Sequence, residues 1–245
     1  MADLPRPLRV TRQALGTMGR HLGIVLAVCG GVTLLRTPLD HLLFNWIVGA
    51  GNSLAGDQET MVKYILADAG MLLLAEVLLG PILAAVAVYL ARRDQVGKTS
   101  NLSGSLNFAV RRYSRMFVPH LAAQISIQIG LQLLIVPGLL FYGMYAFVEP
   151  VSALEEGEWA LDRSKALTRG RRGTIMWLVI PIVAVLFTKT WVVDLQALGN
   201  IWALFATDLV NLLLEFFLYT AFAWLYLERV TPVAAAAPSP EAAQT

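Results

Sequence analysis

The sequence has little charge and almost no cysteine. Charged residues make up 15% of its 245 residues, whereas they make up roughly a quarter of a soluble domain. The single cysteine, Cys29, excludes a disulfide scaffold, and a net charge of only +2 excludes a basic nucleic-acid-binding module. With 57% hydrophobic residues and a mean hydropathy of +0.62, the chain is too apolar to be disordered. The composition predicts an integral membrane protein whose first partner is the phospholipid bilayer.

Catalytic and metal-binding patterns are scarce too. The only histidines are His21, His41 and His120, and none has metal-ligand spacing to another histidine, a cysteine or a carboxylate. The sequence has no nucleophile-elbow or dinucleotide-binding pattern. Cys29 lies in an apolar run, where packing is its expected role. We therefore expect no metal, no cofactor and no enzyme activity, and an intramembrane enzyme built from isolated polar residues is the least favoured alternative.

Long apolar runs predict an all-α integral membrane protein with about six transmembrane helices. A spanning helix needs about 20 apolar residues, and the candidate runs cover residues 18–36, 64–91, 117–136, 138–153, 174–192 and 205–227. Residues 38–47 either extend the first span or lie in the interface. The third and fourth runs form a hairpin around Pro137 and Gly138, which either crosses the bilayer or enters it as a re-entrant pair.

The distribution of basic residues predicts the orientation. Sixteen of the nineteen lysines and arginines fall in the N-terminal segment, in the loops after the second and fourth runs, and in the tail. Basic segments stay in the cytoplasm, so both termini are expected there and the number of spans is expected to be even. The predicted parts are an N-terminal arm without a signal peptide (1–17), a six-helix membrane domain (18–230) and a disordered Ala- and Pro-rich tail (231–245).

Two cytoplasmic amphipathic helices are predicted on the membrane surface. The first covers residues 103–117 and carries Arg111, Arg112 and Arg115. The second lies within residues 154–173, where acidic residues come first and basic residues, including Arg169, Arg171 and Arg172, come last. Leu154, Leu161, Ser164 and Leu167 share its apolar face, and Gly170 closes it. We expect the arginines to hold these loops inside and to reach anionic headgroups, in preference to forming a dedicated lipid or protein docking site.

The second of these segments resembles a known family. The residues that carry the likeness are Ala160, Leu161, Arg163, Ser164, Leu167, Thr168, Gly170, Arg171 and Arg172, preceded by an acidic–glycine pair and the Pro137–Gly138 hairpin. They resemble a bacterial polytopic inner-membrane family related to the membrane domain of glycerophosphoryl diester phosphodiesterases. The likeness covers roughly residues 90–230. It implies a helical inner-membrane protein with cytoplasmic termini and no assigned chemistry.

Eight polar residues interrupt the apolar runs, and they are the candidates for an intramembrane path: Glu76, His120, Gln124, Gln128, Gln132, Asp208, Asn211 and Glu215. Those from 120 to 132 recur every four residues, which predicts one polar stripe on a helix, and Tyr219 continues the set in the last run. By depth, Lys189 and Asp208 could pair. The favoured interpretation is that these groups hydrogen-bond neighbouring helices, and the alternative is a pathway for a proton or small solute.

Three functions follow from these patterns, in order of preference. The first is a non-catalytic inner-membrane protein that organises lipids or a membrane protein partner, because the clearest amphipathic segments lie at the membrane surface. The second is a small-solute or ion transporter or channel, which the prolines Pro81 and Pro181 within two predicted spans favour. The third is an intramembrane enzyme.

Overall fold

The computed structural model describes residues 5–48, 58–133, 135–157, 159–189 and 200–236, and these form nine α-helices and no strand. The all-helical prediction is confirmed. The helices are α1 (Arg6–Arg20), α2 (Leu22–Val48), α3 (Gln58–Gln95), α4 (Leu102–Leu133), α5 (Ile135–Tyr145), α6 (Val148–Leu154), α7 (Ala160–Thr168), α8 (Arg172–Lys189) and α10 (Ile201–Ala236).

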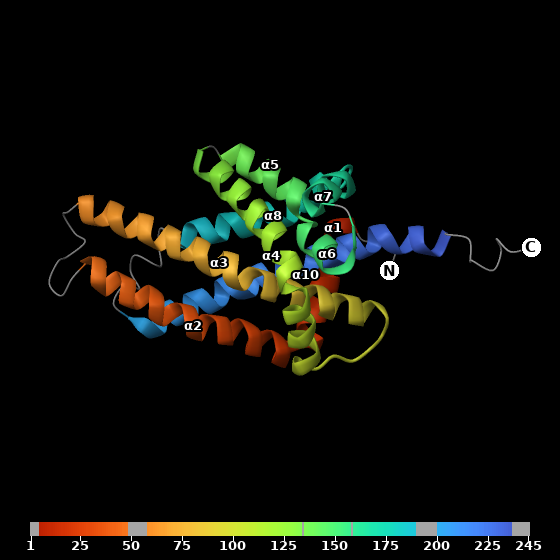
Figure 1. Cartoon of the computed structure of the whole chain (residues 1–245), viewed down its shortest axis with the longest axis horizontal. Coiled ribbons are helices and arrows are strands. Elements are labelled where there is room, and N and C mark those ends of the chain that lie inside the picture. The colour runs from red at the N-terminus through yellow and green to blue at the C-terminus, as the bar shows by residue number, and fades with distance from the viewer. Residues whose placement is uncertain (1–4, 49–57, 134, 158, 190–199, 237–245) are drawn as a thin grey trace, which may run out of the picture.

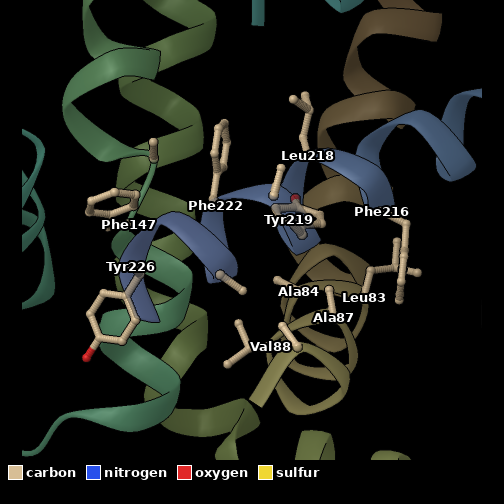
Figure 2. Packing of buried hydrophobic residues seen from close by; sticks show 14 of the residues in the cluster. Leu83, Ala84, Ala87, Val88, Phe147, Phe216, Leu218, Tyr219, Phe222 and Tyr226 are labelled. Atoms are coloured by element: carbon tan, nitrogen blue, oxygen red, sulfur yellow. The ribbon is translucent and has the colours of Figure 1, made fainter. Parts of the chain in front are cut away.

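The long helices α2, α3 and α10 form the body of the molecule. The helix α10 packs against both α2 and α3, while α4 packs on α3 and α5 folds back along α4 (Figure 1). Figure 2 shows that small side chains of α3, such as Ala84 and Ala87, lie near the aromatic residues of α10. Phe216 and Phe222 of that helix are almost fully buried. Small residues let helix backbones approach closely, so this pairing of small and large side chains builds the core.

The N-terminal segment is a helix that the sequence interpretation missed. Residues 6–20 form α1, which the sequence analysis treated as part of an arm (1–17). Val10, Ala14 and Thr17 are fully buried at a spacing of three to four residues, as expected for the inner face of an amphipathic helix. This face packs against α10, so the segment belongs to the folded body.

The prediction of about six membrane spans is not confirmed. Among the described residues, only the segments Leu22–Leu39 and Ile201–Val230 are long and apolar enough to cross a membrane, and Arg172–Val185 is apolar but shorter. Two predicted spans fail for clear reasons. The apolar run 117–136 is continuous with the arginine-rich segment before it, and the run 138–153 is divided between α5 and α6.

Two predicted helices are in fact one. The surface helix at 103–117 and the span at 117–136 together form α4, with Pro119 inside it. The composition changes at residue 117, whereas the helical backbone continues through it. The following α5 has 11 residues, which corresponds to a length of about 16 Å at 1.5 Å per residue. Since the hydrocarbon layer of a membrane is about 30 Å thick, α5 alone is too short to cross one.

The second predicted surface helix and the predicted tail also differ from the structure in their bounds. The predicted second surface helix forms over Ala160–Thr168 as α7, and Gly170 follows it with a φ of 77°, as expected for a closing glycine. The helix α10 continues to Ala236, which is six residues into the segment that the sequence predicts to be disordered. The Ala-rich composition of 234–236 explains the extension, since alanine has the highest helix propensity. Residues 237–245 lie outside the described part of the chain.

Candidate functional site

A buried polar centre lies where α3, α4, α6 and α10 meet. We use the name polar centre for five residues: Glu76, His120, Gln124, Glu149 and Tyr219. Its two acidic side chains and its histidine are largely enclosed, and the His120 side chain is only 1% exposed. Most of the surrounding residues are apolar. Buried ionisable groups of this kind persist only where they are paired or hydrogen-bonded.

The histidine bridges two helices through its two ring nitrogens. Its Nδ1 lies 3.1 Å from Glu149 Oε1 on α6, and its Nε2 lies 3.2 Å from the backbone carbonyl oxygen of Glu76 on α3. A backbone carbonyl only accepts hydrogen bonds, so Nε2 carries a proton. The other nitrogen and the Glu149 carboxyl group therefore share a proton between them.

The second carboxylate of the polar centre, that of Glu76, accepts hydrogen bonds from two side chains. Tyr219 donates its hydroxyl proton to Glu76 Oε1 at 2.5 Å, and Gln124 donates to the same oxygen at 3.1 Å. His120 Nε2 lies 3.7 Å from that oxygen. Donors from α10 and α4 thus converge on this one oxygen. The polar centre therefore brings two carboxyl groups and one imidazole together in an apolar environment, an arrangement that can hold a proton or join the four helices.

A glycine makes room for this arrangement. A Cβ atom at Gly80 would lie 2.6 Å from His120 Nε2 and 2.9 Å from Glu76 Oε1. Real Cβ atoms do not approach other atoms that closely, so Gly80 is required for the histidine to occupy this place.

The sequence identified part of the polar centre. It predicted Glu76, His120 and Gln124, and the structure brings these three together with Tyr219. It missed Glu149 on α6, although an acidic residue inside a predicted span is as costly there as Glu76 or Glu215. That cost is the signal that would have identified it.

The other predicted polar residues lie elsewhere. Asp208 of α10 accepts a hydrogen bond of 2.8 Å from Thr37 of α2 and lies 3.9 Å from an Arg36 nitrogen. Gln128 and Asn211 are partly buried, and Glu215 lies one turn before Tyr219 on α10. The side chains of Gln132 and Lys189 lie outside the described residues. The candidate path therefore divides into the polar centre and a separate Asp208 cluster.

One end of the helical bundle gathers the basic segments. This basic end comprises α1, α6, α7, the start of α8, and the C-terminal ends of α3 and α10 (Figure 1). Arg9 of α1 forms an ion pair with Glu228 of α10 at 3.2 Å, and Arg20 pairs with Asp94 of α3 at 2.6 Å. Arg171 donates to the Leu225 carbonyl oxygen at 2.8 Å. Residues far apart in the sequence are thus tied together at this end.

Charge shifts two pKa values at the basic end. Burial alone would raise the pKa of Asp94, but hydrogen bonds from Arg20, Thr17 and His21 outweigh it, so the pKa is lowered. Burial, and after it the neighbouring Arg6, lower the pKa of Arg171. Positive charge is therefore concentrated around the junction of α1, α8 and α10.

The six arginines predicted for the membrane surface all lie at or near this end, in different settings. Arg111, Arg169 and Arg172 are exposed, and Arg111 contacts Asn107. Arg171 is mostly enclosed. Arg112 and Arg115 both donate to Glu156 Oε1, at 3.4 and 3.3 Å.

An open cavity of about 270 Å³ lies beside Arg115. It is formed by α4, α6 and the segment before α7. Its walls combine charged, aromatic and apolar side chains, and the residues that line it include Arg115, Val118, Pro119, Val151, Ser152, Glu155, Glu156 and Trp159.

The serine of the family-like segment has a structural role. Ser164 of α7 accepts a hydrogen bond from the Phe147 N–H at 3.1 Å and donates one to the Met144 carbonyl oxygen at 2.8 Å. These backbone groups lie at the break between α5 and α6. Leu161, Ser164 and Leu167 are buried on α7, as predicted for one face of this helix, whereas Leu154, which was expected on the same face, belongs to α6. That face packs on α5 and α6.

Within the described residues, no group of three or more histidine, cysteine or acidic side chains could hold a metal ion. The predicted family relationship stays a prediction. Comparisons of the chain with protein-family models, with curated proteins and with solved structures find no match.

Proposed function

We propose that this chain is a non-catalytic, multi-pass protein of the bacterial inner membrane that organises anionic phospholipids at the cytoplasmic surface. In this proposal α2, α3, α8 and α10 cross the bilayer, and α4 with α5 forms a re-entrant hairpin. The number of crossings is then even, and both termini are cytoplasmic. The family resemblance is part of the proposal.

The exposure of the apolar helices supports membrane embedding. Only 39% of the apolar stretch of α2 and 28% of that of α10 are buried within the molecule, whereas the core helix of a soluble protein is mostly buried. Large apolar side chains on these helices, such as Leu34, Leu35 and Val210, are more than half exposed. Exposed apolar surface on this scale marks contact with a membrane or a partner.

The arginines of the basic end carry the functional part of the proposal. Arg111, Arg169 and Arg172 are exposed next to helices whose apolar side chains are also exposed. An anionic leaflet attracts each such side chain by about 1 kcal/mol. A protein partner at Arg169–Arg172 is the competing occupant of this surface.

The polar centre supports a second candidate, proton-coupled transport of a small solute. A buried imidazole between two carboxyl groups is a common arrangement for proton relays in membrane proteins. Against this candidate, the polar residues are divided between two clusters. Their hydrogen bonds join four helices, as interhelical contacts do.

Lipid selectivity tests the proposed function. The full-length protein would be placed in nanodiscs containing phosphatidylglycerol and phosphatidylcholine, and the lipids that stay bound after transfer to detergent would be counted by native mass spectrometry. We expect phosphatidylglycerol to be enriched, and we expect added salt to reduce the enrichment because salt screens surface charge. The triple variant R111Q/R169Q/R172Q should reduce it as well. Equal retention of both lipids by the unaltered protein would refute the proposal.

A further inference from the structure

Two arginines of α4 converge on one exposed carboxylate. Arg112 and Arg115 donate to the same oxygen, Oε1 of Glu156, at 3.4 and 3.3 Å. The Glu156 side chain is 79% exposed, whereas each arginine side chain is about a third exposed. The two arginine side chains are thus partly enclosed, while their carboxylate partner is open to solvent.

The neighbouring carboxylate is bound very differently. Glu155 accepts hydrogen bonds from Arg163 at 2.8 Å and from the Tyr226 hydroxyl at 2.8 Å. Its side chain is 24% exposed, and its partners lie on α7 and α10. Glu155 therefore has a structural role, whereas in the part of the chain that the structure describes Glu156 pairs with the two arginines of α4.

Glu156 lies on a segment between two helices, so its exposed side chain can turn into solvent while the helices keep their positions. Gly157 follows with a φ of 116°, in the left-handed region that favours glycine. Glu156 lies between the end of α6 and the start of α7, outside either helix. Displacement of its side chain would free Arg115, which lines the cavity, and Arg112, which shares the same carboxylate oxygen.

The cavity continues from these charges toward an apolar wall. Val118 of α4 is 52% exposed, and Pro119 and Val151 line the cavity beside it. Trp159, which is half exposed and directly precedes α7, also lines the cavity. A ligand that fits has an anionic group at one end and an apolar body at the other, which is the chemistry of a phospholipid.

We propose that this cavity binds the phosphate of an anionic phospholipid headgroup through Arg112 and Arg115, and that Glu156 is an internal carboxylate which the phosphate displaces. The proposal rests on the function proposed above and deepens it by naming the site. A phosphate can replace Glu156 because it offers several acceptor oxygens to guanidinium groups, which bind phosphate in bidentate fashion. The glycerol and the first part of the acyl chains would lie against Val118, Pro119 and Val151.

Binding of dioctanoyl phosphatidylglycerol to the detergent-purified full-length protein tests the site, with native mass spectrometry as the readout. R115Q should weaken the apparent Kd about tenfold, because each hydrogen bond to a charged group contributes about that factor. E156Q should tighten it several-fold, since the competing carboxylate is removed. D162N is the matched control for E156Q, because it removes an exposed carboxylate of α7 that lies outside the cavity, and it should change the Kd less than twofold.

The outcomes separate this site from the general function. Phosphatidylglycerol binding that is unchanged in both R115Q and E156Q, in variants with unaltered helix content and melting temperature, would refute the site and leave the proposed lipid preference standing. An unaltered protein with no preference for phosphatidylglycerol over phosphatidylcholine would refute both. Competition by inorganic phosphate or glycerol 3-phosphate at the concentration at which the lipid binds would show a site for a soluble phosphate, and it would overturn the lipid assignment.

Discussion

The Tyr219 hydroxyl donates a hydrogen bond of 2.5 Å to Glu76 Oε1, and so joins α10 to α3 inside the apolar body. We expect Y219F to lower the free energy of unfolding by about 1.5–3 kcal/mol, the range for hydrogen bonds to charged groups. Thermal unfolding in detergent, followed by circular dichroism, measures this. Y142F is the control, because it removes a hydroxyl group from a nearby aromatic contact with Phe222, and it should have a smaller effect.

Permeability separates the two interpretations of the polar centre. If the centre joins helices, E149Q and E76Q should lower the melting temperature, because each leaves a buried partner poorly paired, and neither should change the proton flux of liposomes. If it carries protons, the unaltered protein should conduct them and E149Q should abolish the flux while the fold persists. We expect the first result. Proton flux in liposomes with the unaltered protein, absent in E149Q, would contradict it.

Because the backbones of α4 and α5 lie in close contact, substitution of a glycine at that contact should reduce stability far more than substitution of a glycine elsewhere. A Cβ at Gly130 would lie 2.8 Å from the backbone of Gly138, so G130A must push the two helices apart. We expect a loss of about 1–3 kcal/mol, as for other overpacked contacts. At Gly31 no atom lies within 4 Å of such a Cβ, and G31A should be neutral or slightly stabilising because alanine favours helix. Equal melting temperatures for the two variants would contradict this contact.

The attachment of α1 should weaken at low pH. The folded protein lowers the pKa of Asp94 below its ordinary value of 3.8, so the unfolded state binds its proton more tightly. The stabilisation by Asp94 is therefore complete above that ordinary value and is lost as the pH falls through the lower, folded value. Hydrogen exchange of residues 6–20 should rise in this acidic range. D94N should show faster exchange at neutral pH with little further change on acidification, and an equal response in both proteins would exclude this role.

Cysteine labelling tests the proposed topology. The native Cys29 is fully buried, so new exposed cysteines can be followed against a low background. V96C and G173C lie at the basic end and should react only with a cytoplasmic reagent, while I201C, at the start of α10, should react only from the outside. Labelling of V96C from outside would overturn the topology.

The sequence predicts best those features of the fold that depend on residues close to one another in the chain. Apolar runs identified α2, α8 and α10, because burial or lipid contact along a whole helix leaves a continuous local signal. The division of α4 at residue 117 was wrong, since composition records the surroundings of a helix and the backbone can cross a boundary between them. The helix α1 was missed because its arginines dominated the interpretation, although Val10, Ala14 and Thr17 follow the helical period.

The sequence does not predict which residues of different helices meet in the polar centre. The four-residue spacing brought His120 and Gln124 onto one face of a helix, which is a local property. Their actual partners come from α3, α6 and α10, and nothing in the spacing along one helix selects those. Asp208 and Gln124 were placed in one candidate path on polarity alone, whereas helix packing puts Asp208 beside Thr37.

The hydrogen bonds of Ser164 have a consequence for the order of biosynthesis. Its hydroxyl group binds backbone groups of Phe147 and Met144, which precede it by 17 and 20 residues. Chains fold from the N-terminal end as they are made. The helix α5 therefore emerges from the ribosome before Ser164, whose hydroxyl group hydrogen-bonds to the backbone at the end of α5. The backbone at the end of α5 should therefore lack these two hydrogen bonds during early synthesis and form them only after α7 has been made. In a chain arrested before residue 164, α5 should be cleaved readily by protease, and in a chain arrested after α7 it should be protected.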